Sequence, residues 1–385
     1  MLCAIIAIMN KLKLLLAALM LTCAGCSAQP GQSDQADTEL HNYNNLSLDA
    51  GFDTVFTYQE ATETKDIFDA HFQQAVSLFT YYNNLFDIYN SYEGMNNMYT
   101  INENAGVQPV KVDPDLIEML LEAKDYYELS DGKFDITIGS LLKVWHEYRD
   151  AGIETNLAGE PAALPELSEL EEASSRKGWE YVEINEADNT VFITDPDISL
   201  DVGGIAKGFA TEKIAQKLNE LGITNGAVNA GGNTRTLGQK YNGQEWRIGI
   251  QNPDAEGSLI IVKQNGACSF VTSGDYERYF VGTDGEKYHH IIDPDTMYPA
   301  SYFRSVSIIT PDSAAADALS TTLFTMSYED GMKLVEDYRK AYNVSLEVIW
   351  IMSPDKAPDT EYCRKAGGLM VAYTPGLEDS LIWNN

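Results

Sequence analysis

Basic residues are scarce in this chain of 385 residues, in which 26 Lys and Arg stand against 58 Asp and Glu, giving a formal net charge of −32. A surface this acidic repels nucleic acid and the anionic headgroups of lipids. The composition therefore argues against nucleic acid as a partner. It also means that any phosphate-bearing ligand must be held by local hydrogen-bond donors or by a bridging cation.

Cysteine is also scarce. The chain has five, and three of them, Cys3, Cys23 and Cys26, lie within its first 26 residues. The other two, Cys268 and Cys363, are too few for a disulfide framework and do not form a CxxC pair that would suggest a zinc or redox site. A single Cys268–Cys363 disulfide and a pair of free thiols both agree with the sequence.

The apolar run near the N-terminus, Leu14 to Leu21, is too short to span a bilayer stably. Two lysines precede it, and the small residues Ala24 and Gly25 stand directly before Cys26. This arrangement resembles a bacterial lipoprotein signal over residues 1–25, in which Cys26 becomes the lipidated first residue. An ordinary N-terminal core helix is the alternative. Cys23 stands where such signals usually carry Leu.

Residues 26–49 are polar and rich in Gln, Ser, Asp and Asn, without apolar periodicity. This composition is typical of a flexible tether. We therefore expect a lipid anchor at the cell membrane, a tether, and a folded domain over residues 50–385 on the extracytoplasmic face. The sequence does not distinguish between an anchor in an inner membrane and one in a single membrane.

The folded part mixes strand and helix signals without strict βαβ alternation, which predicts an α+β or mixed α/β fold. A strand is expected from Phe52, and residues 153–178 read as a loop leading to a short helix. Helices are expected at about Lys65–Phe86, Pro114–Leu129 after an Asp113 cap, Ala206–Gly222 and Ala314–Met326. Turn residues at Asp188-Asn189 predict a hairpin. Further strands are expected in LDVGG, GAVNAGGN, WRIGIQ, LIIVKQNGACSFVTS, RSVSIIT, EVIWIM and GLMVAYT.

Two segments combine glycines with acidic residues, DGKFDITIGSLLKVW and LDVGGIAKGFA. In the second, Asp201 ends a strand, and Gly203 and Gly204 open a helix beside Lys207. Free backbone N–H groups at such a helix start can bind an anion. The segment is neither GxGxxG nor a P-loop, and a tight strand-to-helix turn explains it equally well.

Two further segments place polar residues near strand ends. In NAGGNTRTLG, Gly231-Gly232 would let a ligand or another backbone approach closely, or would form only a strained turn. VTSGDYERYF and KYHHIIDPDT bring Thr272, Ser273, His290 and Asp293 toward two strand ends. A packed core histidine is the alternative reading of His290.

The segment DSAAADALSTTLF carries Asp317 and Thr321 four residues apart, and so on one face of the expected helix. An acid and a hydroxyl one turn apart can both ligate a hard cation. A helix cap or a solvent-facing pair is the usual alternative. Ala314-Ala315-Ala316 and Leu319 indicate that this face is buried, which favours a ligand role for Asp317.

Together these segments resemble the ApbE family, the FAD:protein FMN transferases, over roughly Gly51 to Tyr373. The motifs occur in family order: Phe52-Asp53-Thr54, GKFDITIGSLLKVW, LDVGGIAKG, NAGGN, TSGDYERYF, HHIIDP and ADALSTTLF. The resemblance implies an ApbE-like fold of mixed sheets with flanking helices. Two departures are Phe52, where many members have Met, and DPDTMYP, where DPxTGxP is common.

The resemblance also implies site residues. Mg²⁺ would be held by Asp317, Thr321 and the backbone carbonyl of Gly204. FAD contacts carry over to Phe52, Tyr89, Phe134, Asp135, Ile136, Asp201, Lys207, His290 and Ile292. His290 and a metal-bound carboxylate, which would be Asp317, are both candidates for the catalytic base.

The activity implied is Mg²⁺-dependent transfer of FMN from FAD to a Thr or Ser hydroxyl of an acceptor, with release of AMP. The expected acceptor is a flavoprotein subunit of a membrane redox complex. Hydrolysis of FAD to FMN and AMP at the same site is an alternative. A non-catalytic flavin-binding lipoprotein is a second one, against which the spacing of Asp317 and Thr321 counts.

Overall fold

In the computed structural model, residues 39–384 are described, so the expected signal peptide and Cys26 lie outside them. The centre is a nine-stranded sheet in the order β1-β2-β6-β7-β10-β13-β14-β16-β15, in which every neighbouring pair is antiparallel. Smaller sheets are β17-β9-β8, β3-β5-β4 and β11-β12. This mixture of sheets and flanking helices confirms the predicted fold class.

The elements follow one another along the chain with these bounds. The strands are β1 His41–Ser47, β2 Phe56–Thr62, β3 Val110–Lys111, β4 Val182–Asn185, β5 Thr190–Ile193, β6 Ala227–Ala230, β7 Asn233–Thr236, β8 Trp246–Gln251, β9 Ser258–Gln264, β10 Cys268–Gly274, β11 Phe280–Val281, β12 Lys287–Tyr288, β13 Ser305–Thr310, β14 Glu347–Met352, β15 Cys363–Ala366, β16 Leu369–Tyr373 and β17 Leu381–Trp383. The α-helices are α2 Lys65–Phe86, α3 Met98–Glu103, α4 Pro114–Leu129, α5 Gly139–Leu157, α6 Leu167–Ser174, α7 Ala206–Glu220, α8 Ser313–Phe324 and α9 Tyr328–Tyr342. Short 3₁₀ turns lie at Trp179–Tyr181, Pro354–Lys356 and Pro375–Leu377.

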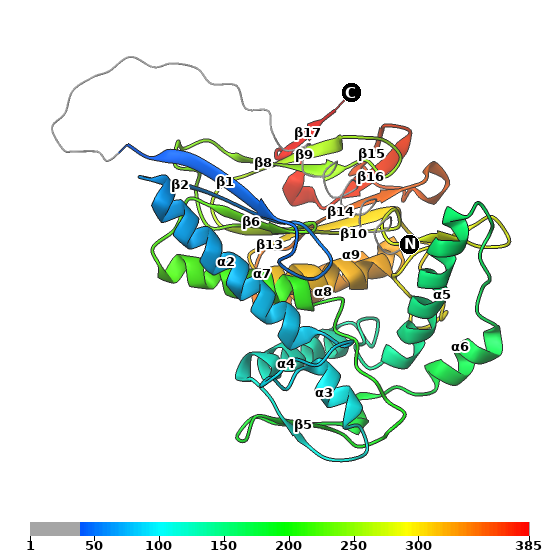
Figure 1. Cartoon of the computed structure of the whole chain (residues 1–385). Coiled ribbons are helices and arrows are strands. Elements are labelled where there is room, and N and C mark those ends of the chain that lie inside the picture. Colours follow the sequence, from blue (N-terminus) through cyan, green and yellow to red (C-terminus); the bar gives the residue numbers. More distant parts are fainter. Residues whose placement is uncertain (1–38, 385) are drawn as a thin grey trace, which may run out of the picture.

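The central sheet is covered on both faces. Helices α2, α7, α8 and α9 lie along one face, and the small sheet β17-β9-β8 lies over the other (Figure 1). Strand β14 shows why its sequence is continuously apolar. Val348, Trp350 and Met352 join the core beneath the helices, whereas Ile349 and Ile351 join the core beneath the small sheet.

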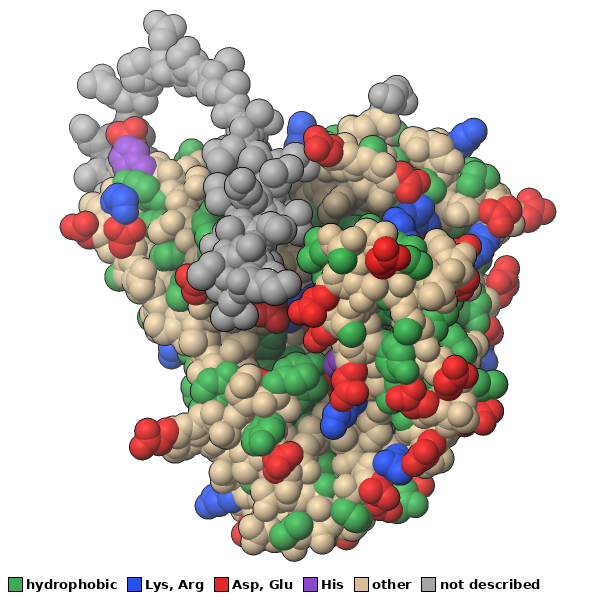
Figure 2. All heavy atoms as spheres, turned by 45° about the vertical axis from the view of Figure 1, so that its right-hand side comes forward, with side chains coloured by type: hydrophobic (Ala, Val, Ile, Leu, Met, Phe, Trp, Pro, Cys, Tyr) green, Lys and Arg blue, Asp and Glu red, His purple; other side chains and the backbone are tan. Residues whose placement is uncertain are grey.

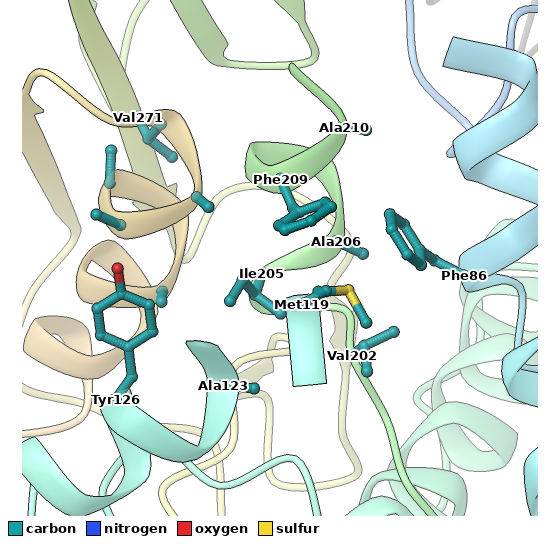
Figure 3. Packing of buried hydrophobic residues seen from close by; sticks show 14 of the residues in the cluster. Phe86, Met119, Ala123, Tyr126, Val202, Ile205, Ala206, Phe209, Ala210 and Val271 are labelled. Atoms are coloured by element: carbon teal, nitrogen blue, oxygen red, sulfur yellow. The ribbon is translucent and has the colours of Figure 1, made fainter. Parts of the chain in front are cut away.

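Helix α7 lies at the centre of the helical layer. Its Phe209 faces Phe86 of α2, while Met119 of α4 packs close to Ile205, just before the helix begins (Figure 3). The rings of Phe209 and Phe86 are both buried, and their centroids lie 5.6 Å apart in an edge-on arrangement. This packing fixes the start of α7, and with it the preceding LDVGG turn.

The predicted helices with clear end signals are confirmed. Asp113 caps α4 by accepting from Asp115 N, and Pro114 takes the first helical position. Gly222 follows α7 with φ +86°, as expected for a glycine that ends a helix. The hairpin β4–β5 turns at Asn189, which has φ +53°.

Four predictions of local structure are wrong. The strand expected to end at LDVGG is absent, since this segment has only an isolated bridge from Ser199 to Ile138. The tether expected over 26–49 includes β1, an edge strand that pairs with β2 and whose side chains are mostly exposed, which explains why no apolar alternation marks it. The strand expected from Phe52 begins only at Phe56, because Phe52 and Asp53 have left-handed φ values of 53° and 49° and form a turn. Helix α5 also extends to Leu157, into the expected loop.

Cys268 is buried and Cys363 is partly buried, and both are free thiols. The disulfide that the sequence left open is therefore absent. None of the helices within residues 39–384 is long and apolar enough to cross a membrane.

Helices α7 and α8 touch at Gly208. A Cβ atom added there would lie 2.3 Å from Ser313 O and 2.4 Å from Asp317 Cβ. The two helices therefore approach as closely as they do only because residue 208 has no side chain.

We expect Gly208→Ala to lower the free energy of unfolding by about 1–3 kcal/mol, because the methyl group forces the helices apart. Denaturant unfolding of the purified protein measures this. Gly331→Ala, also in a helix, is the matched control, since its nearest new neighbour is the flexible end of Leu323 at 3.2 Å. Equal stability of the two variants would contradict the close approach.

A buried polar group joins these helices to the sheet. Arg235 of β7 pairs with Glu212 of α7 at 2.9 Å, and Glu212 also accepts from Ser313 N at 3.0 Å.

Burial, with the nearby charges of Asp312 and Glu118, raises the pKa of Glu122 of α4 from 4.5 to about 8.

A folded-state pKa above the unfolded one means that the folded protein binds the Glu122 proton more tightly. The contribution of Glu122 to stability is therefore full below pH 4.5 and is lost as the pH rises toward 8. We expect Glu122→Gln to have a free energy of unfolding at least about 1 kcal/mol higher than that of the original protein at pH 8. The difference should vanish near pH 5. Denaturant titrations at both pH values test this, and a pH-independent difference would refute it.

Candidate active site

The packing of α7 and α8 brings the first turn of α7, directly after LDVGG, against Asp317. The backbone N–H of Gly208 donates to Asp317 Oδ2 at 2.8 Å, and Lys207 Nζ lies 3.6 Å from Asp317 Oδ1. Two segments more than a hundred positions apart in the sequence therefore meet at one carboxylate.

The Asp317 side chain is deeply buried, with the residue only 3% exposed. Burial raises the pKa of this carboxyl, while Lys207, the Gly208 N–H and the Asn233 amide act in the opposite direction. The Lys207 ammonium and the directed donors around the carboxylate thus offset part of the cost of its burial. Asp317 can thus serve as a hard oxygen ligand.

Thr321 lies one turn further along α8, beside the glycine turn. A Cβ atom at Gly204 would lie 3.5 Å from Thr321 Oγ1 and 3.1 Å from Phe134 Cε2. Gly204, Thr321 and Phe134 are therefore neighbours, and Asp317 is one helical turn away from Thr321. The structure brings together these residues that the sequence placed in one site.

This oxygen set fits a magnesium ion. Within residues 39–384, no group of three or more His, Cys, Asp and Glu side chains could hold a metal by itself. Mg²⁺, however, commonly uses one or two carboxylates and completes its shell with water and substrate phosphates. Asp317, Thr321 and the Gly204 carbonyl match that pattern, and the buried Oδ1 of Asn233 has no hydrogen-bond partner among the described residues.

Asp201 links the glycine turn to the GKFDITIG segment. Its backbone N–H donates to Ile136 O at 2.8 Å, and its Oδ1 accepts from Gly203 N at 2.8 Å. The acid thus fixes the turn that precedes α7 and remains nine-tenths buried. Asp201 and Ile136 therefore lie together, as the sequence placed them.

Asp135 is turned to a different surface. Its Oδ1 accepts from the backbone N–H of Thr137 at 2.8 Å and from the Thr137 hydroxyl at 2.7 Å. It lines a depression of about 310 Å³ together with Tyr127, Lys177 and Glu180. The contacts of this side chain do not join it to Asp317 or Lys207 within the described residues.

His290 lies among positive charges. Burial, followed by the charges of Arg278, His289, Arg149 and Lys207, holds the pKa of His290 well below its usual range. Its Nδ1 is buried and has no hydrogen-bond partner within residues 39–384. The ring is therefore neutral at physiological pH and able to accept a proton or a hydrogen bond. Ile292, two residues on, is buried.

Tyr89 is well exposed, and its hydroxyl lies 2.8 Å from Nδ1 of His146 in α5. Asp201, Arg149 and Arg278 all act electrostatically on His146, so this pair lies in the same region as His290. An exposed aromatic ring held in this way offers a face on which a planar ligand can stack.

Phe52 lies in a strained turn whose conformation is fixed on three sides. Its N–H donates to Asn83 Oδ1 at 2.6 Å, its ring packs 5.0 Å from Phe79, and Arg278 donates to its carbonyl at 3.3 Å. Left-handed φ values at non-glycine residues persist where the surroundings over-determine them, often at binding sites. Thr54, two residues after Phe52, lies against Gly231 of the NAGGN segment.

Four residues of this region were not predicted from the sequence: Asn233, His146, Arg149 and Arg278. Asn233 follows the glycine pair whose close approach was noticed, and that position was the available signal. His146 and Arg149 are three apart on one helix face, but nothing in the local pattern separates them from a solvated surface. Arg278 gains its place only through the folding of its loop.

The cations of the site contrast with the rest of the surface. The face shown in Figure 2 carries many scattered acidic side chains and fewer basic ones, as the net charge of −32 requires. Lys207, Arg149 and Arg278 converge on His290 in this acidic setting. The site thus supplies the local donors that an anionic ligand would need.

Comparison with known proteins gives a consistent result. A sequence profile described as the ApbE family matches residues 52–346. A Treponema pallidum protein named FAD:protein FMN transferase is 36% identical over 255 residues, covering 62% of this chain and 67% of that protein. A Klebsiella pneumoniae protein of the same name is 32% identical over 234 residues, covering 60% and 68%.

Solved structures agree. The ApbE protein of Thermotoga maritima superposes with a TM-score of 0.67 at 29% identity, covering 80% of this chain and 94% of that one. The flavin transferase ApbE of Vibrio cholerae superposes with a TM-score of 0.69 over 89% of this chain and all of that one, which at 23% identity shows the shared fold. The extent of the profile match and the identity to its relatives show that this chain belongs to the ApbE family.

Proposed function

We propose that this protein is a magnesium-dependent FAD:protein FMN transferase. The observation that carries the proposal is the contact between the buried Asp317 carboxylate and the first turn of α7, directly after LDVGG, with Thr321 beside Gly204. The relatives named FAD:protein FMN transferase support the proposal.

The chain's own residues would bind and orient FAD. Lys207 would donate to the pyrophosphate, while Arg149 and Arg278 would add positive charge nearby. Tyr89 and Phe52 offer aromatic surface for the flavin or the adenine, whereas the Phe134 ring is buried beside Gly204. Magnesium held by Asp317, Thr321 and the Gly204 carbonyl would neutralise phosphate oxygens and the leaving group.

The transfer itself exchanges one bond for another. The hydroxyl oxygen of an acceptor Thr or Ser forms a bond to the phosphorus on the riboflavin side, and the bond from that phosphorus to the bridging oxygen breaks. AMP leaves with the bridging oxygen, and the hydroxyl proton passes to a base. Neutral His290 and the Asp317 carboxylate are the two candidates for that base, and positioning would supply much of the acceleration.

The surroundings of the reaction belong to the same proposal. Residues 1–25 would act as a lipoprotein signal and Cys26 as the lipidated residue, so that the enzyme would work at the extracytoplasmic face of the cell membrane. The acceptor would be a flavoprotein subunit of a membrane redox complex, held within reach of the anchored domain.

One assay separates transfer from its alternatives. Incubation with FAD, Mg²⁺ and a candidate acceptor, followed by a denaturing gel, should give a fluorescent acceptor band together with free AMP. AMP without the band would indicate hydrolysis of FAD, and neither product would indicate flavin storage.

Asp317→Asn should lower the rate at which both the labelled acceptor and AMP form by at least about 100-fold relative to the original protein. The reason is that the amide cannot supply the negatively charged oxygen that a hard cation requires. Its fold should survive, since the replacement is isosteric. Asp337→Asn, an exposed acid of α9, is the matched control and should remain fully active. Full activity of Asp317→Asn would remove the assigned metal site.

His290→Gln should lower kcat about 100-fold or more if His290 is the base, because general bases typically contribute that much. Since its pKa is held well below 6.5, His290 stays unprotonated as the pH falls from 8 to 6.5, and the rate should not drop in that range on its account. A pH–rate profile of both proteins tests this. A titration near pH 6.5 that disappears in His290→Gln would contradict the depressed pKa.

A further inference from the structure

Asn233 opens β7 directly after Gly231 and Gly232, whose φ values of 57° and 93° allow the hairpin to turn tightly. It pairs with Ala230 of β6 and Val271 of β10. Arg235, two residues on, reaches Glu212 of α7, so the side chains of this strand alternate and Asn233 also points to the helical face.

Asn233 is among the most buried polar residues of the described chain, with 1% exposure. Its side-chain amide hydrogen-bonds to the Asp317 carboxylate, but its Oδ1 is buried without a hydrogen-bond partner among residues 39–384. A buried amide oxygen left unpaired lowers the stability of the fold. Such an atom needs a reason to persist, and an absent ligand at Asp317 provides one.

We propose that Asn233 is a further residue of the divalent-cation site, in which its amide positions Asp317 and its Oδ1 supplies an oxygen to the cation or to a cation-bound water. The inference rests on the proposed function, since it takes the cation at Asp317 as given. Amide oxygens are ligands of hard cations, and partners that orient a ligating carboxylate contribute strongly to metal affinity.

The choice of an amide at this position has an electrostatic consequence. Asp317 already faces Lys207 at 3.6 Å, so the buried charges are balanced before a cation enters. A neutral amide adds an oxygen without a second buried negative charge, which would repel Asp317 when the cation is absent. Asn233 would therefore add to the affinity for the cation without introducing repulsion between two buried carboxylates in the metal-free protein.

Titration of Mn²⁺ into the purified full-length protein, without FAD, measures this directly by calorimetry. Asn233→Ala should weaken Mn²⁺ binding by about tenfold or more relative to the original protein. Thr234→Ala, whose side chain points to the opposite face of the same strand, is the matched control and should bind as the original protein does. Unchanged affinity in folded Asn233→Ala would overturn the inference.

Asn233→Asp provides the second test, because it keeps an oxygen and adds a charge. Without metal its melting temperature should fall below that of the original protein, and Mn²⁺ should raise it by more than it raises the original. A folded Asn233→Asp protein that no longer binds Mn²⁺ would also overturn the inference, and it decides the question if Asn233→Ala does not fold.

The same titration keeps the two proposals apart. If the original protein and Thr234→Ala fail to bind Mn²⁺, the cation assigned to Asp317 is wrong, and with it the metal dependence of the proposed function. If both bind Mn²⁺ and Asn233→Ala binds it equally well, only the role of Asn233 is wrong.

Discussion

The burial of the Asp317 carboxylate is the constraint on which the rest of the site depends. An ionised carboxylate removed from water loses several kcal/mol of solvation unless charges and hydrogen bonds replace it. Here the Gly208 N–H, Lys207 and Asn233 provide the replacement. The Gly208 N–H and Lys207 reach Asp317 only because α7 and α8 pack without a side chain at residue 208, so helix packing and site chemistry are one requirement.

The same requirement explains how an acidic protein can recognise an anionic substrate. Long-range attraction is absent when the net charge is −32, and the affinity has to come from groups in direct contact. The charges of Lys207, Arg149 and Arg278 all act on His290, while Asp201 fixes the turn before α7 by accepting from Gly203 N. Specific contacts thus replace bulk electrostatics, and the acidic surface elsewhere disfavours other polyanions.

Sequence alone predicted those features whose causes are local. Helices α2, α4 and α7 carry caps, prolines and terminal glycines within a few residues, and their bounds were predicted closely. Strand β1 was missed because its exposed polar side chains show no alternation, and only pairing with β2 defines it. Likewise Asn233 could not be assigned from its motif, since its burial arises where β7 meets α8, and Asp135 faces a surface that its motif did not indicate.

Charge balance connects these observations to the choice of substrate. Asp317 and Lys207 lie 3.6 Å apart and cancel each other, so the proposed divalent cation would leave two positive charges in the site. The pyrophosphate of FAD carries two negative charges, so Asp317, Lys207, the cation and the pyrophosphate together would carry no net charge. A carboxylate in place of Asn233 would add one uncompensated negative charge to this sum. A side chain without oxygen would remove one of the oxygens proposed to hold the cation. A buried neutral amide meets both conditions, which is the physical reason for an asparagine beside the buried aspartate.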